Sequence, residues 1–325
     1  MGNRPVHRVG EQGSLGNNMQ HDAGITRLST AGGLLAIVLW SATFALARSL
    51  SEQVGSLPAG AAAYLFGGTI CLLWLWWSPT PFRRLLKLSR RYVWGCGFLF
   101  VFYTALIYLA VGLAKDREQL LEIALVNYLW PAATILFSIP ILNKRANLLL
   151  VPGTGLALAG VFLVMTQGAR VSWLSFREHL QSTPVAYLLV LIAAIAWALY
   201  SNLARRWSEP ESGGAVGLFV PATGVVLLVM RLFSPEPASW SAQAVGEAGV
   251  LGAITVLAYG LWDVAMRKGN LLLVAACSYL TPLLSTLVSC AYLKVMPGSQ
   301  LWAGCAPIVV GSMVSWRSVS EACGP

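Results

Sequence analysis

Two proline-containing segments carry the residues of this sequence best suited to holding a polar solute. They read NYLWP at residues 127–131 and SYLTP at residues 278–282, and each lies in the middle of a hydrophobic run. Each proline frees the backbone carbonyl four residues before it, that of Asn127 or of Ser278, because proline donates no hydrogen bond and clashes with the preceding turn. Freed carbonyls beside amide, hydroxyl and aromatic groups can bind a solute. The predicted binding residues in the two segments are Asn127, Tyr128, Trp130, Pro131, Ser278, Tyr279 and Pro282.

The alternative for both prolines is a packing role, in which each only bends a helix around its neighbours. Polar or aromatic residues occupy equivalent places in the two segments, Asn127 with Ser278 and Trp130 with Thr281. Matching interrupted helices in two halves of a transporter indicate a binding site at the membrane midplane. We therefore favour a cavity, and the difference between Trp130 and Thr281 suits a ligand with two unlike sides.

Two acidic residues inside apolar runs are the second candidate chemistry, since ionisable residues in a membrane are functional candidates. Glu122 lies just over one turn before Asn127, and Asp263 lies one turn before Arg267 and Lys268. We predict a gating or proton-linked role for Glu122 and Asp263. The alternative for Asp263 is an i,i+4 ion pair with Arg267.

The composition of the chain shows which elements must position these residues. Of the 325 residues, 57% are hydrophobic and 11% are charged, and the mean hydropathy is +0.67. That is too little charge to cover a water-soluble protein of this size. Runs of about 20 apolar residues, long enough to cross a bilayer, recur ten times. The predicted spans are 31–50, 58–78, 92–113, 119–140, 147–166, 184–204, 213–233, 244–266, 271–293 and 300–319. We predict an all-α integral membrane protein with ten transmembrane helices in the lipid bilayer.

An internal repeat divides the chain into two halves. Residues of the fourth and fifth spans match those of the ninth and tenth at a constant offset of 151 residues: Tyr128 with Tyr279, Leu129 with Leu280, Pro131 with Pro282, Ser138 with Ser289, Gly153 with Gly304 and Gly160 with Gly311. In addition, WSATFALAR from Trp40 resembles WALYSNLAR from Trp197. Each half holds five spans, an odd number, so the two halves enter the membrane from opposite sides. We predict two inverted five-helix repeats over residues 27–166 and 184–320, joined by a connector over 167–183.

The N-terminal residues 1–26 are polar, rich in Gly and Asn, and lack apolar periodicity, so we predict a disordered cytoplasmic tail. Arg27, the apolar run from Ala31 and the small residues near Ala45 imitate a signal peptide. Because the segment from Trp40 has a counterpart deep in the chain, we instead expect the first run to be a permanent helix.

Basic residues orient the predicted helices. When alternate connectors are assigned to the two sides of the membrane, 15 of the 22 Lys and Arg residues fall on one side. By the positive-inside rule that side is cytoplasmic, and both termini lie there. This topology accounts for the net charge of +9. No nucleic acid is expected as a partner, since a nucleic-acid-binding protein would need basic residues clustered on one face of a soluble module.

These features together resemble a known family. Ten spans, an inverted five-plus-five duplication, short connectors and Gly-rich fifth and tenth helices look like the drug/metabolite transporter superfamily with two EamA domains, over residues 31–319. Within it, NYLWP at 127–131 is similar to the signature of the aromatic amino acid exporters of the YddG type. The resemblance implies export of Phe, Trp and Tyr across a bacterial inner membrane. The inverted halves suit alternating access around a midplane cavity.

An aromatic amino acid near pH 7 is a zwitterion, so its carrier needs hydrogen-bond donors, acceptors and rings. A ring pair contributes about 0.5–1.5 kcal/mol beyond its buried area. The predicted ring residues of the site, besides Trp130, are Trp40, Tyr103, Trp197, Tyr200 and Tyr259, with Tyr64 and Trp262 as further candidates. The alternative for most of the 13 Trp residues is helix packing or an interface belt, as at Trp74, Trp76 and Trp77.

Other functional classes explain the sequence less well. An enzyme is not expected, because the chain lacks His-Glu-x-x-His, Gly-x-Ser-x-Gly and a phosphate-binding glycine loop. No metal or cofactor is expected, since the six Cys show no Cys-x-x-Cys spacing and the three His lie in the tail or a connector. A channel would need a filter sequence, which is absent.

The main alternative is an exporter of cationic drugs, such as methyl viologen, or of other small metabolites on the same scaffold. A cation carrier is expected to hold an acid deep in its cavity, and the first span holds none. Aromatic rings alone can nevertheless bind organic cations. A monomer is the expected state, with an oligomer as the alternative.

Overall fold

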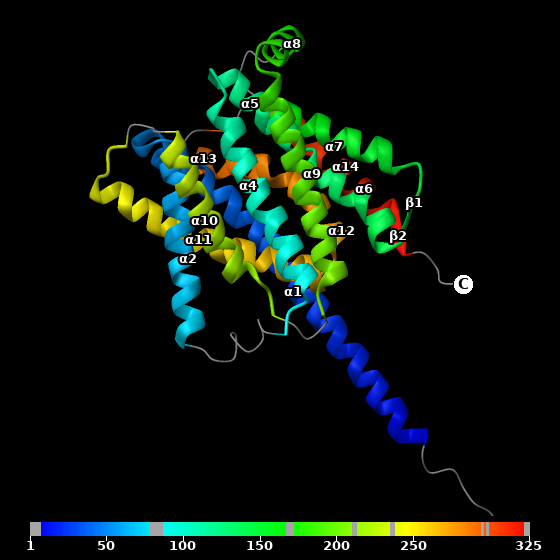
Figure 1. Ribbon diagram of the computed structural model, residues 1–325. Coiled ribbons are helices and arrows are strands. Elements are labelled where there is room, and N and C mark those ends of the chain that lie inside the picture. Colours follow the sequence, from blue (N-terminus) through cyan, green and yellow to red (C-terminus); the bar gives the residue numbers. More distant parts are fainter. Residues whose placement is uncertain are drawn as a thin grey trace, which may run out of the picture.

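The structure, a computed structural model, describes residues 8–77, 87–166, 172–209, 213–234, 238–293, 296 and 299–321. These residues form a helical bundle (Figure 1). One short antiparallel pairing joins β1, Lys144–Ala146, to β2, Val319–Glu321. The helices are α1 Arg8–Val54, α2 Ser56–Trp77, η1 Tyr92–Cys96, α4 Gly97–Gly112, α5 Arg117–Asn127, α6 Trp130–Leu142, α7 Leu150–Met165, α8 Trp173–Ser182, α9 Pro184–Trp207, α10 Val216–Phe233, α11 Ala242–Lys268, α12 Leu271–Cys277, η2 Ser278–Leu280, α13 Thr281–Leu293 and α14 Ser299–Arg317.

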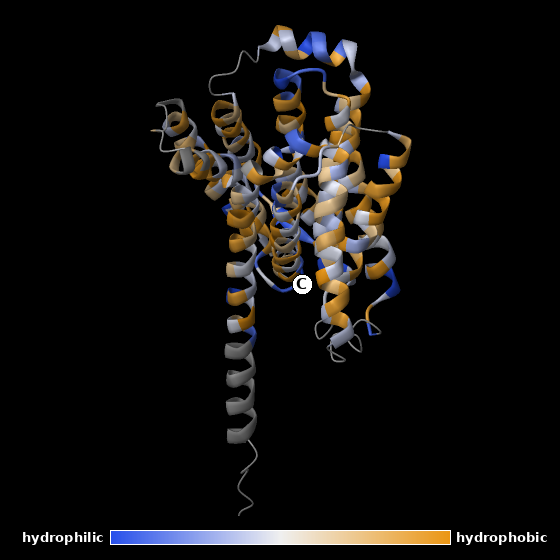
Figure 2. Ribbon diagram, turned by 90° about the vertical axis from the view of Figure 1, so that its left-hand side faces the viewer, coloured by the Kyte–Doolittle hydropathy of each residue, from blue (hydrophilic) through white to orange (hydrophobic). Residues whose placement is uncertain are grey.

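Every predicted apolar run coincides with a helix or with consecutive helical segments. Among the described residues, eight helical segments are long and apolar enough to cross a membrane, and α7 is a shorter apolar helix. Hydrophobic residues predominate along the long helices, whereas hydrophilic stretches gather at α8 and at helix ends (Figure 2). Trp76 and Trp77, at the end of α2, are both highly exposed, as expected of an interface belt. The predicted all-α membrane fold is confirmed.

The N-terminal segment differs from its prediction. Residues 1–7 of the predicted disordered tail lie outside the described residues, but the backbone from Arg8 onward is helical and continues without a break to Val54. No proline lies between these two residues. The helical hydrogen bonding of the apolar run can therefore propagate through the polar segment, because each added residue adds one bond to an existing helix.

The packing partners exchange between the two halves of the chain. In the order of the ten predicted spans, α1 is the first and packs on α11, the eighth. The equivalent pair in the other half is α9, the sixth span, and α4, the third, and these two helices also pack together. The second helix, α2, packs on its own counterpart α10, and α7 packs on its counterpart α14. An exchange of this kind is what a pseudo-twofold relation between two repeats produces.

Glycines allow the closest of these contacts. A Cβ added at Gly160 would lie 2.8 Å from the carbonyl oxygen of Gly304, and one at Gly311 would lie 2.7 Å from that of Gly153. The 151-residue offset relates Gly153 to Gly304 and Gly160 to Gly311, so each contact joins one glycine from each of these two related pairs. Since small residues let membrane helices approach closely, the repeat-matched glycines fix the contact between α7 and α14.

Both predicted proline interruptions are present. Helix α5 ends at Asn127 and α6 begins at Trp130, with Pro131 in its first turn. In the second half, the 3-10 turn η2 separates α12 from α13. The carbonyl of Ser278, which Pro282 frees, accepts hydrogen bonds from the backbone N–H of Thr281 and from its hydroxyl at 2.8 Å. The bend therefore leaves that carbonyl paired within the protein, as a membrane interior requires.

Candidate transport site

Eight rings from five helices meet in the middle of the bundle. This aromatic cluster consists of Trp40, Phe100, Tyr103, Trp130, Trp197, Tyr200, Tyr259 and Trp262. Trp197, which is 2% exposed, has its ring centroid 4.7 Å from that of Tyr103 and 4.9 Å from that of Tyr200. The ring centroid of Trp262 lies 5.1 Å from that of Trp40 and 5.3 Å from that of Trp130. Both halves of the chain contribute rings, so the cluster lies on the pseudo-twofold interface.

Two buried polar atoms near these rings have no hydrogen-bond partner among the described residues: Asn127 Oδ1 and Trp262 Nε1. The first is an acceptor and the second a donor. A buried polar group without a partner is unfavourable by about 1–3 kcal/mol. A ligand carrying an ammonium and a carboxylate could satisfy both. A third polar feature is the contact of 2.9 Å between the hydroxyls of Tyr64 and Tyr259.

The structure places the other predicted tyrosines elsewhere. Tyr128 and Tyr279 are buried in a separate hydrophobic cluster with residues of α7 and α14, such as Val161 and Ile308. Tyr128 lies in the turn between α5 and α6, two positions before Trp130, and its side chain packs in this separate cluster. Pro131, Pro282 and Ser278 are also buried, and the Ser278 hydroxyl donates to the carbonyl of Ala275. These residues shape the interruptions rather than the ring cluster.

Asp263 lies at the centre of a buried polar cluster at one end of the bundle. Its side chain is 1% exposed and accepts three hydrogen bonds: from Tyr92 Oη at 2.6 Å, from Tyr200 Oη at 3.1 Å and from Arg267 Nε at 2.7 Å. Tyr92 Oη in turn accepts from the backbone N–H of Ala215 at 3.2 Å. The i,i+4 pair with Arg267 is therefore confirmed as a contact. However, this ion pair is buried, and the cluster also includes Tyr92 of η1, Tyr200 of α9 and the backbone of the connector before α10.

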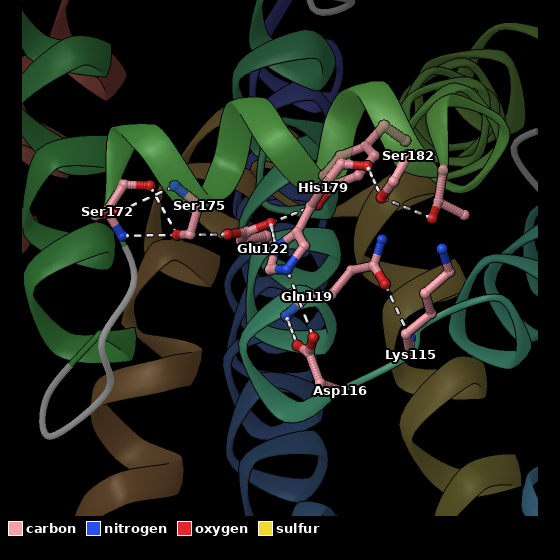
Figure 3. Close-up of polar contacts among 10 residues, drawn as sticks. Lys115, Asp116, Gln119, Glu122, Ser172, Ser175, His179 and Ser182 are labelled. Atoms are coloured by element: carbon pink, nitrogen blue, oxygen red, sulfur yellow. Dashed lines mark hydrogen bonds and ion pairs between the residues drawn. The ribbon is translucent and has the colours of Figure 1, made fainter.

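Glu122 lies at the centre of a second buried polar cluster, beneath α8 (Figure 3). Its Oε2 lies 3.0 Å from His179 Nδ1 and accepts a hydrogen bond from the Tyr187 hydroxyl, while its Oε1 accepts from Ser175 Oγ at 3.3 Å. His179 Nε2 also lies 3.5 Å from Asp116 Oδ2. The Glu122 cluster thus ties α8 to α5 and α9.

The two acidic clusters lie at opposite ends of the bundle. The continuous helix of η1 and α4 runs from Tyr92, in the Asp263 cluster, to Gly112, just before α5 and Glu122. Its 21 residues span about 30 Å at 1.5 Å per residue. The rings of Phe100 and Tyr103 lie along this helix, so the aromatic cluster lies between the two acidic clusters.

Several residues of these clusters were not predicted. His179 was assigned to a connector without a role, and its partner Glu122 lies 57 residues earlier, so no local pattern relates them. Tyr92 and Phe100 were also missed, because an aromatic residue in an apolar run gives no sign of which way it faces. Ser172 and Ser175 form a capping box at the start of α8, but Ser175 stands where the sequence signature of such a box has Glu or Gln, so the sequence did not reveal this helix.

Comparison with known proteins agrees with this architecture. The EamA-like transporter family matches residues 28–166 and 184–317. The aromatic amino acid exporter YddG of Escherichia coli K12 is 32% identical over 289 residues, which cover 89% of this chain and 96% of that protein. YddG of Ancylobacter novellus is 29% identical over 291 residues, covering 88% of this chain and 96% of that protein. A solved crystal structure that is 28% identical aligns with a TM-score of 0.74 over 89% of this chain and 97% of its own. With two matched repeats covering most of its length, the chain belongs to the EamA-like transporter family.

Proposed function

We propose that this protein exports aromatic amino acids across a bacterial inner membrane, by alternating access around the aromatic cluster, with both termini in the cytoplasm. The observation that carries the proposal is the ring cluster built from both halves, with an unpaired donor and an unpaired acceptor beside it. The relatives named aromatic amino acid exporters support the same substrate class.

The groups at the cluster match the parts of a zwitterionic aromatic solute. The solute's ring would stack among Trp40, Trp130 and Trp197, where each ring pair contributes about 0.5–1.5 kcal/mol beyond its buried area. Its carboxylate would accept from Trp262 Nε1–H, and its ammonium would donate to Asn127 Oδ1. Each of these hydrogen bonds to a charged group contributes about 1.5–3 kcal/mol.

The two acidic clusters would act as the closures of the transport pathway. In this proposal the Asp263 cluster closes the cytoplasmic end by joining η1, α9 and α11, and the Glu122 cluster closes the external end through α8. Each closure links a helix of the first half to one of the second half. Rocking of the two repeats would then break one closure while the other holds.

An exporter of organic cations on the same scaffold is the alternative. A cation carrier is expected to use a free carboxylate in its pathway. The carboxylate of Asp263 is already neutralised by Arg267 and bonded to two tyrosines. This arrangement favours a solute without net charge.

Efflux from proteoliposomes tests the proposal. Vesicles containing the purified protein would be loaded with labelled Phe or Trp, and wild type would be compared with Trp130→Ala and Asn127→Ala. Trp74→Ala is the matched control, because Trp74 is exposed on α2 away from the cluster. We expect the first two variants to lose most efflux and the control to keep it. Competition by Tyr, but little by Leu, Lys or methyl viologen, is the expected selectivity. Release of methyl viologen without release of Phe or Trp would instead establish the cation exporter.

A further inference from the structure

One buried amide joins two of the helices that carry the aromatic cluster. Asn202 lies on α9, five residues after Trp197, and is fully buried. Its Nδ2 donates two hydrogen bonds of 2.9 Å, one to the carbonyl of Ala198 on its own helix and one to the carbonyl of Thr134 on α6. The second bond runs from the second half of the chain to the first. Asn202 therefore ties α6 to α9 inside the bundle, where the two helices pack side by side (Figure 1).

The Thr134 carbonyl lies one helical turn after Trp130. Trp130 begins α6 and follows the turn at residues 128 and 129, so no continuous helix before it holds its position. Thr134 Oγ1 donates to the Trp130 carbonyl at 2.7 Å. A bond from Asn202 to Thr134 thus acts on the beginning of α6, and this part of the helix carries the Trp130 ring.

The same bond relates two rings of the cluster. The ring centroids of Trp130, on α6, and Trp197, on α9, lie 6.4 Å apart, with their planes at 86°. The bond joins the two helices within about one and a half turns of each ring. At the far end of α6, Arg206 Nη1 donates to the Ile141 carbonyl at 2.9 Å. Helix α9 therefore holds α6 near its beginning and near its end.

Stability alone does not account for an asparagine at this place. Asn202 Oδ1 is buried and has no hydrogen-bond partner among the described residues. A buried acceptor without a partner is unfavourable, and hydrogen bonds between membrane helices are individually weak. The neighbouring residue, Ser201, is equally buried, but its hydroxyl donates only within α9, to the carbonyl of Trp197 at 2.9 Å. The contact with α6 is what distinguishes Asn202.

We propose that Asn202 is a positioning residue of the transport site, which holds Trp130 opposite Trp197 through the backbone of Thr134. Asn202 acts through α6 and does not touch the solute. The inference rests on the proposed export of aromatic amino acids, because it assigns a role within that site. Loss of the amide should loosen Trp130 and weaken solute binding. The fold should stay at least as stable, because the unpaired Oδ1 is removed as well.

Fluorine NMR of the full-length protein labelled with 5-fluorotryptophan tests the positioning without any solute. The resonance of Trp130 is assigned by its loss in Trp130→Phe. Asn202→Leu keeps nearly the size of asparagine but has no donor, and we expect it to shift or broaden this resonance. The resonance of Trp76, which is exposed at the end of α2, should not change. Ser201→Ala is the matched control, since it removes a buried hydroxyl that bonds only within α9, and it should leave both resonances unchanged.

Equilibrium binding of labelled Phe to the same variants measures the consequence for the site. Asn202→Leu should raise the Kd for Phe roughly two- to tenfold, the affinity that one misplaced ring pair contributes. In the Trp130→Phe background the same change should have little further effect, because residues that act through one contact are not additive. The unfolding temperature of Asn202→Leu should equal or exceed that of wild type.

The outcomes separate positioning from packing and from the export function. An unchanged Trp130 resonance in Asn202→Leu, or an equal rise in Kd with and without Trp130, would overturn the proposal. A lower unfolding temperature with an unchanged Kd would also overturn it and show that Asn202 only packs α6 against α9. If wild type binds no Phe although the Trp130 resonance responds to Asn202→Leu, the export function fails and the positioning holds. Asn202→Ala, which needs no new side chain to fit, provides the same resonance and Kd measurements if Asn202→Leu does not fold.

Discussion

Replacing Asp263 by Asn should open the end of the bundle that the Asp263 cluster closes. The amide has nearly the size of the carboxylate, so the change removes the charge and leaves the packing. Arg267, whose side chain is 2% exposed, would then lose the carboxylate that lies 2.7 Å from its Nε. Removing one member of a buried ion pair typically costs about 3–5 kcal/mol.

The expected magnitude follows from that cost. If the closed arrangement loses the interaction and the open one does not, the population of the open form rises about tenfold for every 1.4 kcal/mol. The predicted change is therefore roughly two to three and a half powers of ten. The two tyrosine bonds to Asp263, at 2.6 and 3.1 Å, would weaken in the same direction, because their acceptor loses its charge.

A native cysteine offers the assay. Cys96 is fully buried and lies one turn after Tyr92 in η1. The reporter chain would keep Cys96 and replace the other five cysteines by Ser: Cys71, Cys277, Cys290, Cys305 and Cys323. We expect the rate of maleimide labelling at Cys96 to rise about a hundredfold or more in Asp263→Asn.

A double variant separates gating from general damage. In Asp263→Asn with Arg267→Met, the buried guanidinium that loses the Asp263 carboxylate is removed as well, so labelling should return most of the way to the wild-type rate. If the single variant labels no faster than wild type although it folds, the Asp263 cluster does not hold this end closed and the reasoning is wrong.

Three further predictions concern packing, α8 and an exposed ion pair. Gly311→Ala should lower stability by about 1–3 kcal/mol in thermal unfolding, because its Cβ would collide with the backbone nitrogen of Ala157 on α7, whereas Gly155→Ala, with open space around it, should leave stability unchanged. His179→Ala should speed hydrogen exchange across α8, since it removes the imidazole shared by two carboxylates; unchanged exchange would argue against a closure there. The Arg48 side chain lowers the pKa of the Glu52 carboxyl, so any stabilisation exists above the ordinary Glu pKa and disappears as the pH falls through the lowered value. Because both side chains are exposed, Arg48→Ala should leave the unfolding temperature unchanged at neutral pH, and a clear drop would show a stronger pair than we infer.

The features that could be predicted from the sequence are those with local or periodic signals. Prolines mark the interruptions at Asn127 and Ser278 because proline removes a hydrogen bond wherever it occurs. The glycines at Gly153 and Gly304 share one offset because each repeat must present its small residues to the other. Apolar length alone is enough to locate the membrane-spanning helices, but not α8, which is polar, or the N-terminal extension of α1.

The acidic clusters could not be predicted, because their contacts join residues far apart in the chain. The hydroxyl of Tyr92 reaches Asp263 across 171 residues, and that of Tyr187 reaches Glu122 across 65. Nor does the sequence tell which face of an interrupted helix a side chain occupies. Tyr128 and Trp130 are therefore equivalent site candidates in the sequence, although Tyr128 lies in the interruption between α5 and α6 and the two side chains pack in different clusters.

The central claim, that aromatic amino acids bind at the aromatic cluster, is tested most directly by photolabelling. The purified protein would be illuminated with 4-azido-L-phenylalanine, and the modified residues would be mapped by mass spectrometry. We predict adducts at Trp40, Trp130, Trp197 or Tyr259 that excess Phe prevents and excess Lys does not. Adducts confined to exposed tryptophans such as Trp76, or adducts that Phe leaves unchanged, would contradict the claim.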